Sequence, residues 1–173
     1  MSKAWTPDLS WIQPDLAVGG SFPSERAAEL ADRSGIGAVI DVRAECCDDA
    51  RHLSACGLEF LHLPTLDMAG VSQPLLDLGV DFTRDVSQAG CRVLIHCEHG
   101  IGRSATLALC CLADRGFEPF AALTMIKNVR ALVSPSEAQY RAWAKWLDRH
   151  GFGPAPSYPD FGMVAYRHLA RSA

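Results

Sequence analysis

The chain has 173 residues, of which 49% are hydrophobic and 21% are charged, and its formal net charge is -4. This composition is typical of one globular domain, and the negative charge argues against binding to nucleic acid or to an anionic membrane surface. Because no apolar run approaches the roughly 18 residues of a membrane span and the N-terminus lacks the apolar core of a signal peptide, we expect a cytoplasmic protein without a membrane span.

Strand and helix patterns alternate along the chain. In chain order the sequence predicts two short strands within 9–19, a helix over 24–34, a strand over 38–42, a short helix over 48–56, a strand over 58–63, a helix over 74–89, a strand over 91–95 and helices over 105–116, 118–130 and 136–150. This alternation predicts an α/β fold, with a central, mostly parallel sheet of about five strands and helices on both faces.

The strand over 38–42 has a distinctive composition and a polar end. Apart from Asp41 it is a continuous apolar run, which is typical of a strand that is covered on both faces of its sheet. Arg43 and Glu45 follow at its carboxyl end, where ligands gather in such sheets. We interpret these two side chains as an ion pair at the end of the strand.

The C-terminal region differs in composition from the rest of the chain. Residues 151–162 form a connector rich in Pro, Gly and aromatic residues, without helical or strand periodicity, and a short apolar and basic stretch follows over 163–171. We therefore expect a catalytic domain over 1–150 and an extension over 151–173 that packs back on it, in a monomer. A tail that binds a partner is the alternative.

The run Val93-Leu94-Ile95-His96-Cys97-Glu98-His99-Gly100-Ile101-Gly102-Arg103-Ser104 carries the chemistry. A strand, a loop with glycines and the start of a helix together form a phosphate site, because backbone N–H groups converge there and the helix N-terminus adds positive charge. Such a site favours the thiolate form of Cys97. Arg103 can grip two phosphoryl oxygens at once, and Ser104 places a hydroxyl beside the sulfur. The run therefore predicts cysteine-dependent phosphoryl transfer.

The pattern His96-Cys97-x₅-Arg103-Ser104 resembles the signature loop of the protein tyrosine phosphatase superfamily. In size and layout, residues 10–150 are most similar to its compact dual-specificity and atypical bacterial-type members. The resemblance implies a dual-specificity phosphatase-like fold and a phosphorylated protein or small phosphate ester as substrate. It also implies that the reaction needs no metal and no other cofactor.

Asp67 is the candidate general acid and base. It follows a predicted strand in a loop between Pro64 and Gly70, 30 residues before Cys97. In the family that the signature loop resembles, the acid is an aspartate in such a loop at about that distance. Asp77 and Asp81 compete for the role, but they fall inside a predicted helix.

The resemblance assigns further roles. The expected phosphate-binding residues, acting largely through backbone N–H groups, are Glu98, His99, Gly100, Ile101, Gly102 and Arg103. His96 is expected to hold the loop by hydrogen bonding. Gln139 is expected to position water or, alternatively, to face solvent on its helix, and Ser136 stands where many members carry Asn.

Other interpretations of the same residues remain open. The same chemistry on a phosphoinositide or inositol phosphate is one alternative, although Glu98 and the absence of lysine from the loop argue against a phosphoinositide. A rhodanese-like sulfurtransferase is another, and a catalytically inactive phosphate-binding module is a third. A metal site would need His96, Cys97 and His99 with His52 or His62.

The seven cysteines are expected to be reduced thiols. Their number is odd, two pairs are adjacent in sequence, and no secretion signal is recognised. Cys110 and Cys111 fall in an apolar helix and are expected to pack in the core. Whether Cys46 or Cys47 forms a redox disulfide with Cys97 stays open at this point.

Overall fold

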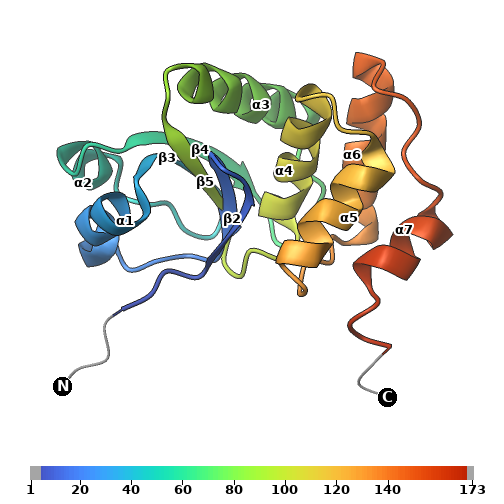
Figure 1. The fold of residues 1–173 in the computed structure, drawn as a ribbon, viewed down its shortest axis with the longest axis horizontal. Helices are drawn as coiled ribbons and strands as arrows, with labels where there is room; N and C mark the ends of the chain where they lie inside the picture. The colour runs from blue at the N-terminus through green and yellow to red at the C-terminus, as the bar shows by residue number, and fades with distance from the viewer. Residues whose placement is uncertain (1–4, 171–173) are drawn as a thin grey trace.

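The computed structural model describes residues 5–170, which form a five-stranded sheet with helices on both faces (Figure 1). The strands are β1 (Leu9–Gln13), β2 (Leu16–Gly19), β3 (Ile36–Arg43), β4 (Glu59–Thr65) and β5 (Arg92–His96), in the spatial order β1-β2-β5-β3-β4. The β1–β2 hairpin is antiparallel, and the other three pairings are parallel. The predicted α/β fold with a mostly parallel sheet is confirmed.

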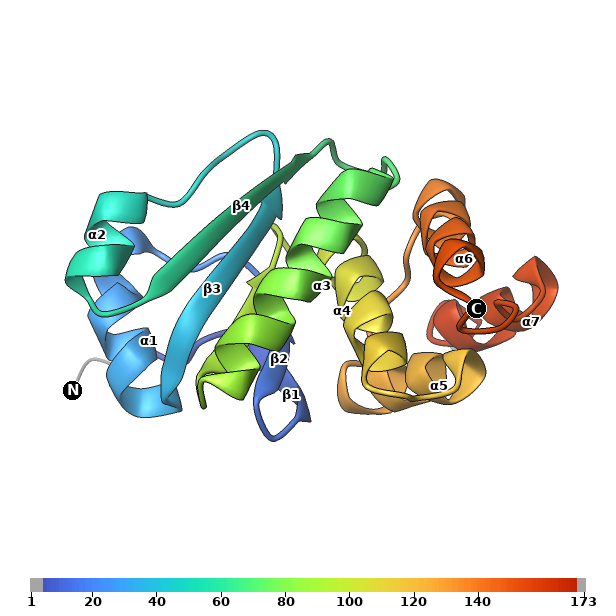
Figure 2. The same ribbon diagram turned by 90° about the horizontal axis from the view of Figure 1, so that it is seen from above.

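The helices form two unequal layers. On one face lie the short 3₁₀ turn η1 (Ser24–Arg26), α1 (Ala27–Ser34) and α2 (Ala50–Ala55); on the other lie α3 (Gln73–Gln88), α4 (Arg103–Asp114), α5 (Pro119–Val129), α6 (Glu137–His150) and α7 (Tyr158–Ala165). Figure 2 shows α1 and α2 on one side of the sheet, α3 and α4 on the other, and α5 to α7 beyond α4.

The two faces of the central strands enter two different cores. Ala38, Ile40 and Val42 of β3 pack in the large core with α3 to α7, whereas Val39 packs in a smaller core with α1 and α2. Successive side chains of a strand point to opposite faces, so both faces of β3 are apolar because both are covered. This burial accounts for the apolar run over 38–42, which Asp41 alone interrupts.

The carboxyl ends of β3 and β5 lie side by side in the middle of the sheet. Asp41 of β3 pairs in register with His96 of β5, and the strand after β3 in space, β4, ends at Thr65 on the same edge. Ligands bind at this edge of parallel sheets, particularly where the strand order reverses. The loops after β3, β4 and β5 therefore converge at one place.

The C-terminal region contains a helix where the sequence predicted a connector. α7 covers residues 158–165, so the prediction of an irregular segment over 151–162 is wrong for its last part. The Ser157 hydroxyl accepts from the backbone N–H of Asp160 and caps the helix. Phe161 and Ala165, four residues apart, are fully buried in the large core.

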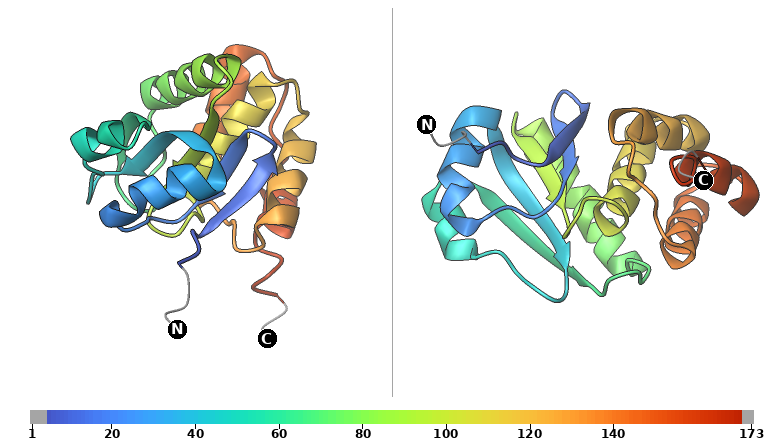
Figure 3. Two further views of the ribbon diagram at one scale, coloured as in Figure 1. Left: turned by 60° about the vertical axis from the view of Figure 1, so that its left-hand side comes forward. Right: turned by 90° about the horizontal axis from the view of Figure 1, so that it is seen from below.

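The same helix lies beside α5 and α6, far from α1 and α2 (Figure 3). α7 thus contacts α5 and α6, while the end of the predicted 163–171 stretch falls outside the described residues. The division into a domain and an extension at residue 150 stays a prediction. Within residues 5–170, no helix has the length and apolarity that crossing a membrane requires.

Candidate functional site

Cys97 lies at the start of the loop that joins β5 to α4. Only 3% of the residue is exposed, and its Sγ lies 3.3 Å from the Ser104 Oγ. Burial by itself raises the pKa of the Cys97 thiol, but hydrogen bonds from the Ser104 hydroxyl and from the backbone N–H groups of Ser104, Gly100 and Ile101 outweigh it, so the pKa is lowered. The loop is therefore built to hold a thiolate.

Glycine is required at position 100 by both conformation and space. Gly100 has a φ of 65°, a left-handed conformation that other residues adopt at a cost. A Cβ at this position would lie 2.5 Å from the backbone carbon and oxygen of Gly19. The close approach of the two backbones lets the loop curl around Cys97, with its N–H groups directed inward.

Arg103 is the first residue of α4 and is only 3% exposed. Its Nη1 and Nη2 donate to Oε2 and Oε1 of Glu45, both at 2.7 Å, and Nη1 also donates to the Thr65 carbonyl at 2.9 Å. These bonds from Arg103 lower the pKa of Glu45 to about 2. Among the described residues, no group accepts from the Arg103 Nε, so this edge of the guanidinium can receive a phosphoryl oxygen.

The predicted ion pair between Arg43 and Glu45 is wrong. Glu45 turns to Arg103, and Arg43 turns back to the buried Asp41, with bonds of 3.0 Å from Nε and from Nη2. Arg43 also donates to Asp48 at 2.8 Å. Asp41 is completely buried, so its charge needs a paired cation close by, and Arg43 is two residues away on the same strand.

Asp67 lies in the loop between β4 and α3, at the mouth of the same site. Its carboxylate is 75% exposed, and its Oδ1 lies 3.4 Å from the Arg103 Nη2. A pocket of about 150 Å³ opens between this loop and the loop of Cys97. Of the predicted site residues, those that line the pocket are Asp67, Cys97, Glu98, His99, Ile101, Gly102, Arg103 and Gln139. The nucleophile, the guanidinium and the candidate acid therefore meet in one cavity.

Gly100, Ser104 and His96 lie behind the pocket, whereas Gln139 lines it. Ser104 and Gly100 contact Cys97 from within the protein, and His96 is fully buried at the end of β5. Gln139 is 2% exposed, so the solvent-facing alternative is wrong. Its Oε1 accepts from the Ser136 N–H at 2.8 Å in a capping box of α6, which commits this oxygen to the helix start.

One segment after α5 supports both loops through hydrogen bonds. We call residues 130–136 the bridging segment. Arg130 donates from Nε to the Gly100 carbonyl and from Nη2 to the His99 carbonyl, both at 2.8 Å, and the Ser134 N–H donates to the Ile101 carbonyl at 3.0 Å. At its other end, the Ser136 hydroxyl donates to the Met68 carbonyl at 2.7 Å.

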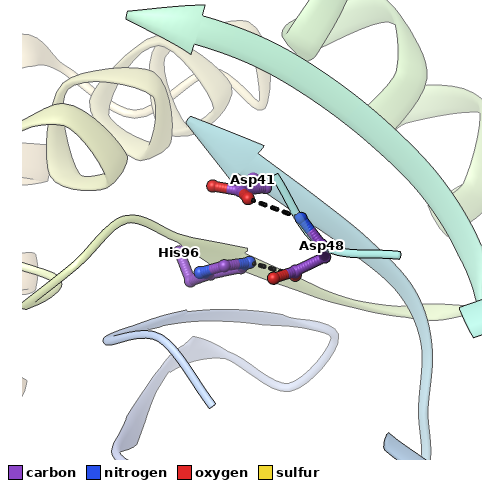
Figure 4. A group of neighbouring side chains, drawn as sticks. All are labelled: Asp41, Asp48 and His96. Atoms are coloured by element: carbon purple, nitrogen blue, oxygen red, sulfur yellow. Dashed lines mark hydrogen bonds and ion pairs between the residues drawn. The ribbon is translucent and has the colours of Figure 1, made fainter. Parts of the chain in front are cut away.

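Asp41, Asp48 and His96 lie close together at the carboxyl ends of β3 and β5 (Figure 4). His96 Nε2 and Asp48 Oδ2 are 2.8 Å apart, and the Asp48 N–H donates to Asp41 at 3.2 Å. Within residues 5–170, this trio alone brings three metal-ligand atoms together, within 4.8 Å of one another. The Arg43 guanidinium is bonded to both carboxylates, and its charge opposes a cation there.

The six cysteines other than Cys97 range from exposed to buried, with Cys56 and Cys91 between the two extremes. Cys46 and Cys47 are exposed in the loop after β3, whereas Cys110 and Cys111 are buried in α4. Burial raises the pKa of Cys111 to about 12, which makes this thiol unreactive. Whether Cys46 or Cys47 forms a redox disulfide with Cys97 stays an open question.

The chain is similar to known proteins over most of its length. Residues 20–148 match the family model described as the catalytic domain of dual specificity phosphatases. Dual specificity protein phosphatase 1 of Homo sapiens is 31% identical over 134 residues, which cover 72% of this chain and 33% of that relative. The chain thus spans about a third of the length of that relative.

Solved structures show the same fold. Tk-PTP in its active form has a TM-score of 0.76 and 24% sequence identity, covering 83% of this chain and 98% of its own. PTPMT1 in complex with PI(5)P has a TM-score of 0.74 and 20% identity, covering 95% of this chain and 99% of its own. At sequence identities of 20% and 24%, the similarity to these structures shows the fold alone.

Proposed function

Because the chain belongs to the dual specificity phosphatase catalytic domain family, we propose that it hydrolyses phosphate monoesters through a phosphocysteine intermediate. One observation carries the proposal: Cys97, Arg103 and Asp67 line one pocket, and the pKa of the Cys97 thiol is lowered. These are the nucleophile, the anion-binding group and the proton donor that the reaction requires.

In the first half-reaction the Cys97 thiolate attacks phosphorus. A sulfur–phosphorus bond forms, the bond from phosphorus to the ester oxygen breaks, and Asp67 donates its proton to the leaving oxygen. The loop N–H groups and the free Nε edge of Arg103 hold the equatorial oxygens, and this stabilises the charge of the transition state. Glu45 fixes the opposite edge of the guanidinium throughout.

In the second half-reaction water attacks the phosphocysteine. Asp67, now ionised, takes a proton from that water, the sulfur–phosphorus bond breaks, and inorganic phosphate is released. The electron pair returns to Cys97 as a thiolate, which the Ser104 hydroxyl stabilises from 3.3 Å. The guanidinium and amide groups supply the charge stabilisation, so the cycle as written uses no metal.

The charge around the pocket supports a phosphorylated protein or a small ester with few negative charges as the substrate. The charged side chains paired with one another there comprise two guanidinium groups, Arg43 and Arg103, and five carboxylates, Asp41, Glu45, Asp48, Asp67 and Glu98. Glu98 is 46% exposed beside the pocket. This excess of negative charge repels phosphoinositides and inositol polyphosphates, which carry several phosphates.

The proposal also covers the cellular compartment, the domain division and the oligomeric state of the protein. Seven free cysteines, two of them adjacent and exposed, suit a reducing compartment such as the cytoplasm. We take residues 1–150 as the catalytic domain, with the extension 151–173 packed on it, and the active protein as a monomer.

The test is hydrolysis of an aryl phosphate by the purified protein, with inhibition by vanadate. Cys97→Ser should abolish turnover and still bind substrate, because it removes the thiolate and keeps the loop. Asp67→Asn should slow hydrolysis of esters with poor leaving groups far more than that of p-nitrophenyl phosphate. If Asp67→Asn matches the parent on every ester, Asp67 is not the acid, and transfer of sulfane sulfur to cyanide would instead support a sulfurtransferase.

A further inference from the structure

The bridging segment is held in turn by the C-terminal region. The Tyr166 hydroxyl, just after α7, donates to the Pro135 carbonyl at 2.7 Å. Lys127 of α5 donates from Nζ to the Val133 carbonyl at 2.6 Å and to the Ala165 carbonyl, the last of α7, at 2.5 Å. Two carbonyls of the bridging segment, those of Val133 and Pro135 on either side of Ser134, are thereby linked to the C-terminal region.

Lys127 is buried between the bridging segment and the C-terminal region. It is 1% exposed, and its Nζ also lies 2.8 Å from the His168 Nδ1. A buried ammonium or amine must satisfy its donors within the protein, and these acceptors come from the bridging segment and from the C-terminal region. Lys127 therefore links the bridging segment to the C-terminal region through direct hydrogen bonds.

The bridging segment contacts both loops of the site. Ser134 bonds to Ile101 in the loop of Cys97, and Ser136 bonds to Met68, next to Asp67. Met68 has a φ of 60°, a strained conformation for a residue other than glycine, so the bond to its carbonyl helps to keep the loop in this shape. The position of Asp67 relative to Cys97 thus depends on residues 134–136.

We propose that Tyr166 and Lys127 are positioning residues for the reaction: through the bridging segment they set the distance from Asp67 to the leaving oxygen of a phosphate ester bound at Cys97. The inference rests on the proposed function of the site. Tyr166 lies beyond residue 148, where the match to the family model ends. The C-terminal helix is therefore part of the catalytic unit of this chain.

Loosening the bridging segment should impair proton donation by Asp67 and leave the attack by Cys97 unchanged. The Asp67 carboxylate is 75% exposed, whereas Cys97 is 3% exposed and enclosed by its own loop. Proton transfer needs hydrogen-bond contact with the ester oxygen, and a misplacement of about 1 Å can cost up to about 100-fold in rate. A loosened bridging segment should therefore reduce turnover most for esters that need the acid.

The experiment is Tyr166→Phe, which removes one hydroxyl and keeps the ring. The measurement is kcat/KM for p-nitrophenyl phosphate divided by kcat/KM for phenyl phosphate, in which the fraction of active protein cancels. Thr83→Val is the matched control, because it removes a buried hydroxyl that donates to a backbone carbonyl, Gly79 O at 2.7 Å, in α3. The ratio should rise roughly fivefold or more in Tyr166→Phe and stay at the parent value in the control.

Lys127→Met is the second variant and should raise the same ratio, with circular dichroism confirming that the protein is folded. If Lys127→Met does not fold, the ratio measured for Tyr166→Phe alone tests the inference. A parent that hydrolyses both esters, together with an unchanged ratio in Tyr166→Phe, overturns the inference and leaves the proposed function intact. A parent that hydrolyses neither ester overturns the proposed function itself.

Discussion

Replacing Ser104 by alanine should reduce the thiolate fraction of Cys97 at neutral and acidic pH. The Ser104 Oγ lies 3.3 Å from the Cys97 Sγ, and both residues are buried. A hydrogen bond to a charged group contributes about 1.5–3 kcal/mol, and about 1.36 kcal/mol corresponds to a factor of ten in such an equilibrium. The thiolate fraction below the pKa should therefore fall by about 10- to 160-fold.

The assay is the rate of alkylation of Cys97 by iodoacetamide as a function of pH. Only the thiolate reacts, so the midpoint of the profile follows the pKa of this thiol. Because Cys46 and Cys47 are exposed and also react, modification is followed on the peptide that contains Cys97 by mass spectrometry. The midpoint should move upward in Ser104→Ala.

The parent should keep high reactivity at lower pH than a free cysteine, because the folded loop lowers the pKa of Cys97. Thr83→Val, which also deletes a buried hydroxyl, should leave the profile unchanged. A midpoint that is the same in Ser104→Ala and in the parent would refute the reasoning, because it would assign the lowered pKa to the backbone N–H groups alone.

Two further predictions concern the loop and the buried lysine. Gly100→Ala should abolish vanadate binding, because the new Cβ would meet the Gly19 backbone at 2.5 Å, whereas Gly116→Ala, with a φ of 90° and no atom within 4 Å, should keep it; equal binding in both variants would contradict the steric argument. The pKa of Lys127 is lowered by burial to about 8 from 10.5, so between pH 8 and pH 10 the unfolded chain binds more protons at this site and the free energy of unfolding should rise with pH, by at most about 3 kcal/mol. Chemical denaturation across this range should show the rise in the parent relative to Lys127→Met; a constant difference would contradict it.

The fold and the loop of Cys97 could be predicted from the sequence because both depend on local patterns. The apolar run over 38–42 predicts a strand that is covered on both faces. The spacing from Cys97 to Arg103 places both residues in one short loop that leads into a helix. The family of the chain is confirmed by the match over 20–148. The role of Asp67 came from resemblance and stays a prediction.

The partners of the site residues could not be predicted, because they are distant in sequence. Glu45 and Arg103 are 58 positions apart, and nothing in the sequence near Glu45 indicates that it should prefer Arg103 to Arg43. One signal was available: Asp41 interrupts an apolar run, and a buried carboxylate requires a cation. That requirement leads to Arg43, which leaves Glu45 for another partner.

The individual contacts of the bridging segment, and the helix α7, were not predicted, for different reasons. Arg130 and Ser134 act on backbone carbonyls, and backbone acceptors leave no mark in a sequence. α7 is one helical stretch of eight residues with only two buried side chains, Phe161 and Ala165, so its periodicity is too short to detect. The capping pair of Ser157 and Asp160 was the readable signal.

The pairing of Arg103 with Glu45 has a consequence for when conformational entropy is lost. A free arginine side chain carries about 2 kcal/mol of rotamer entropy, which a ligand that orders it must offset. Here two bonds of 2.7 Å to Glu45 and one of 2.9 Å to Thr65 immobilise the guanidinium when the chain folds. The arginine side chain is already ordered when the phosphoryl group binds. The loss of its rotamer entropy therefore lowers the stability of the folded protein and does not weaken substrate binding.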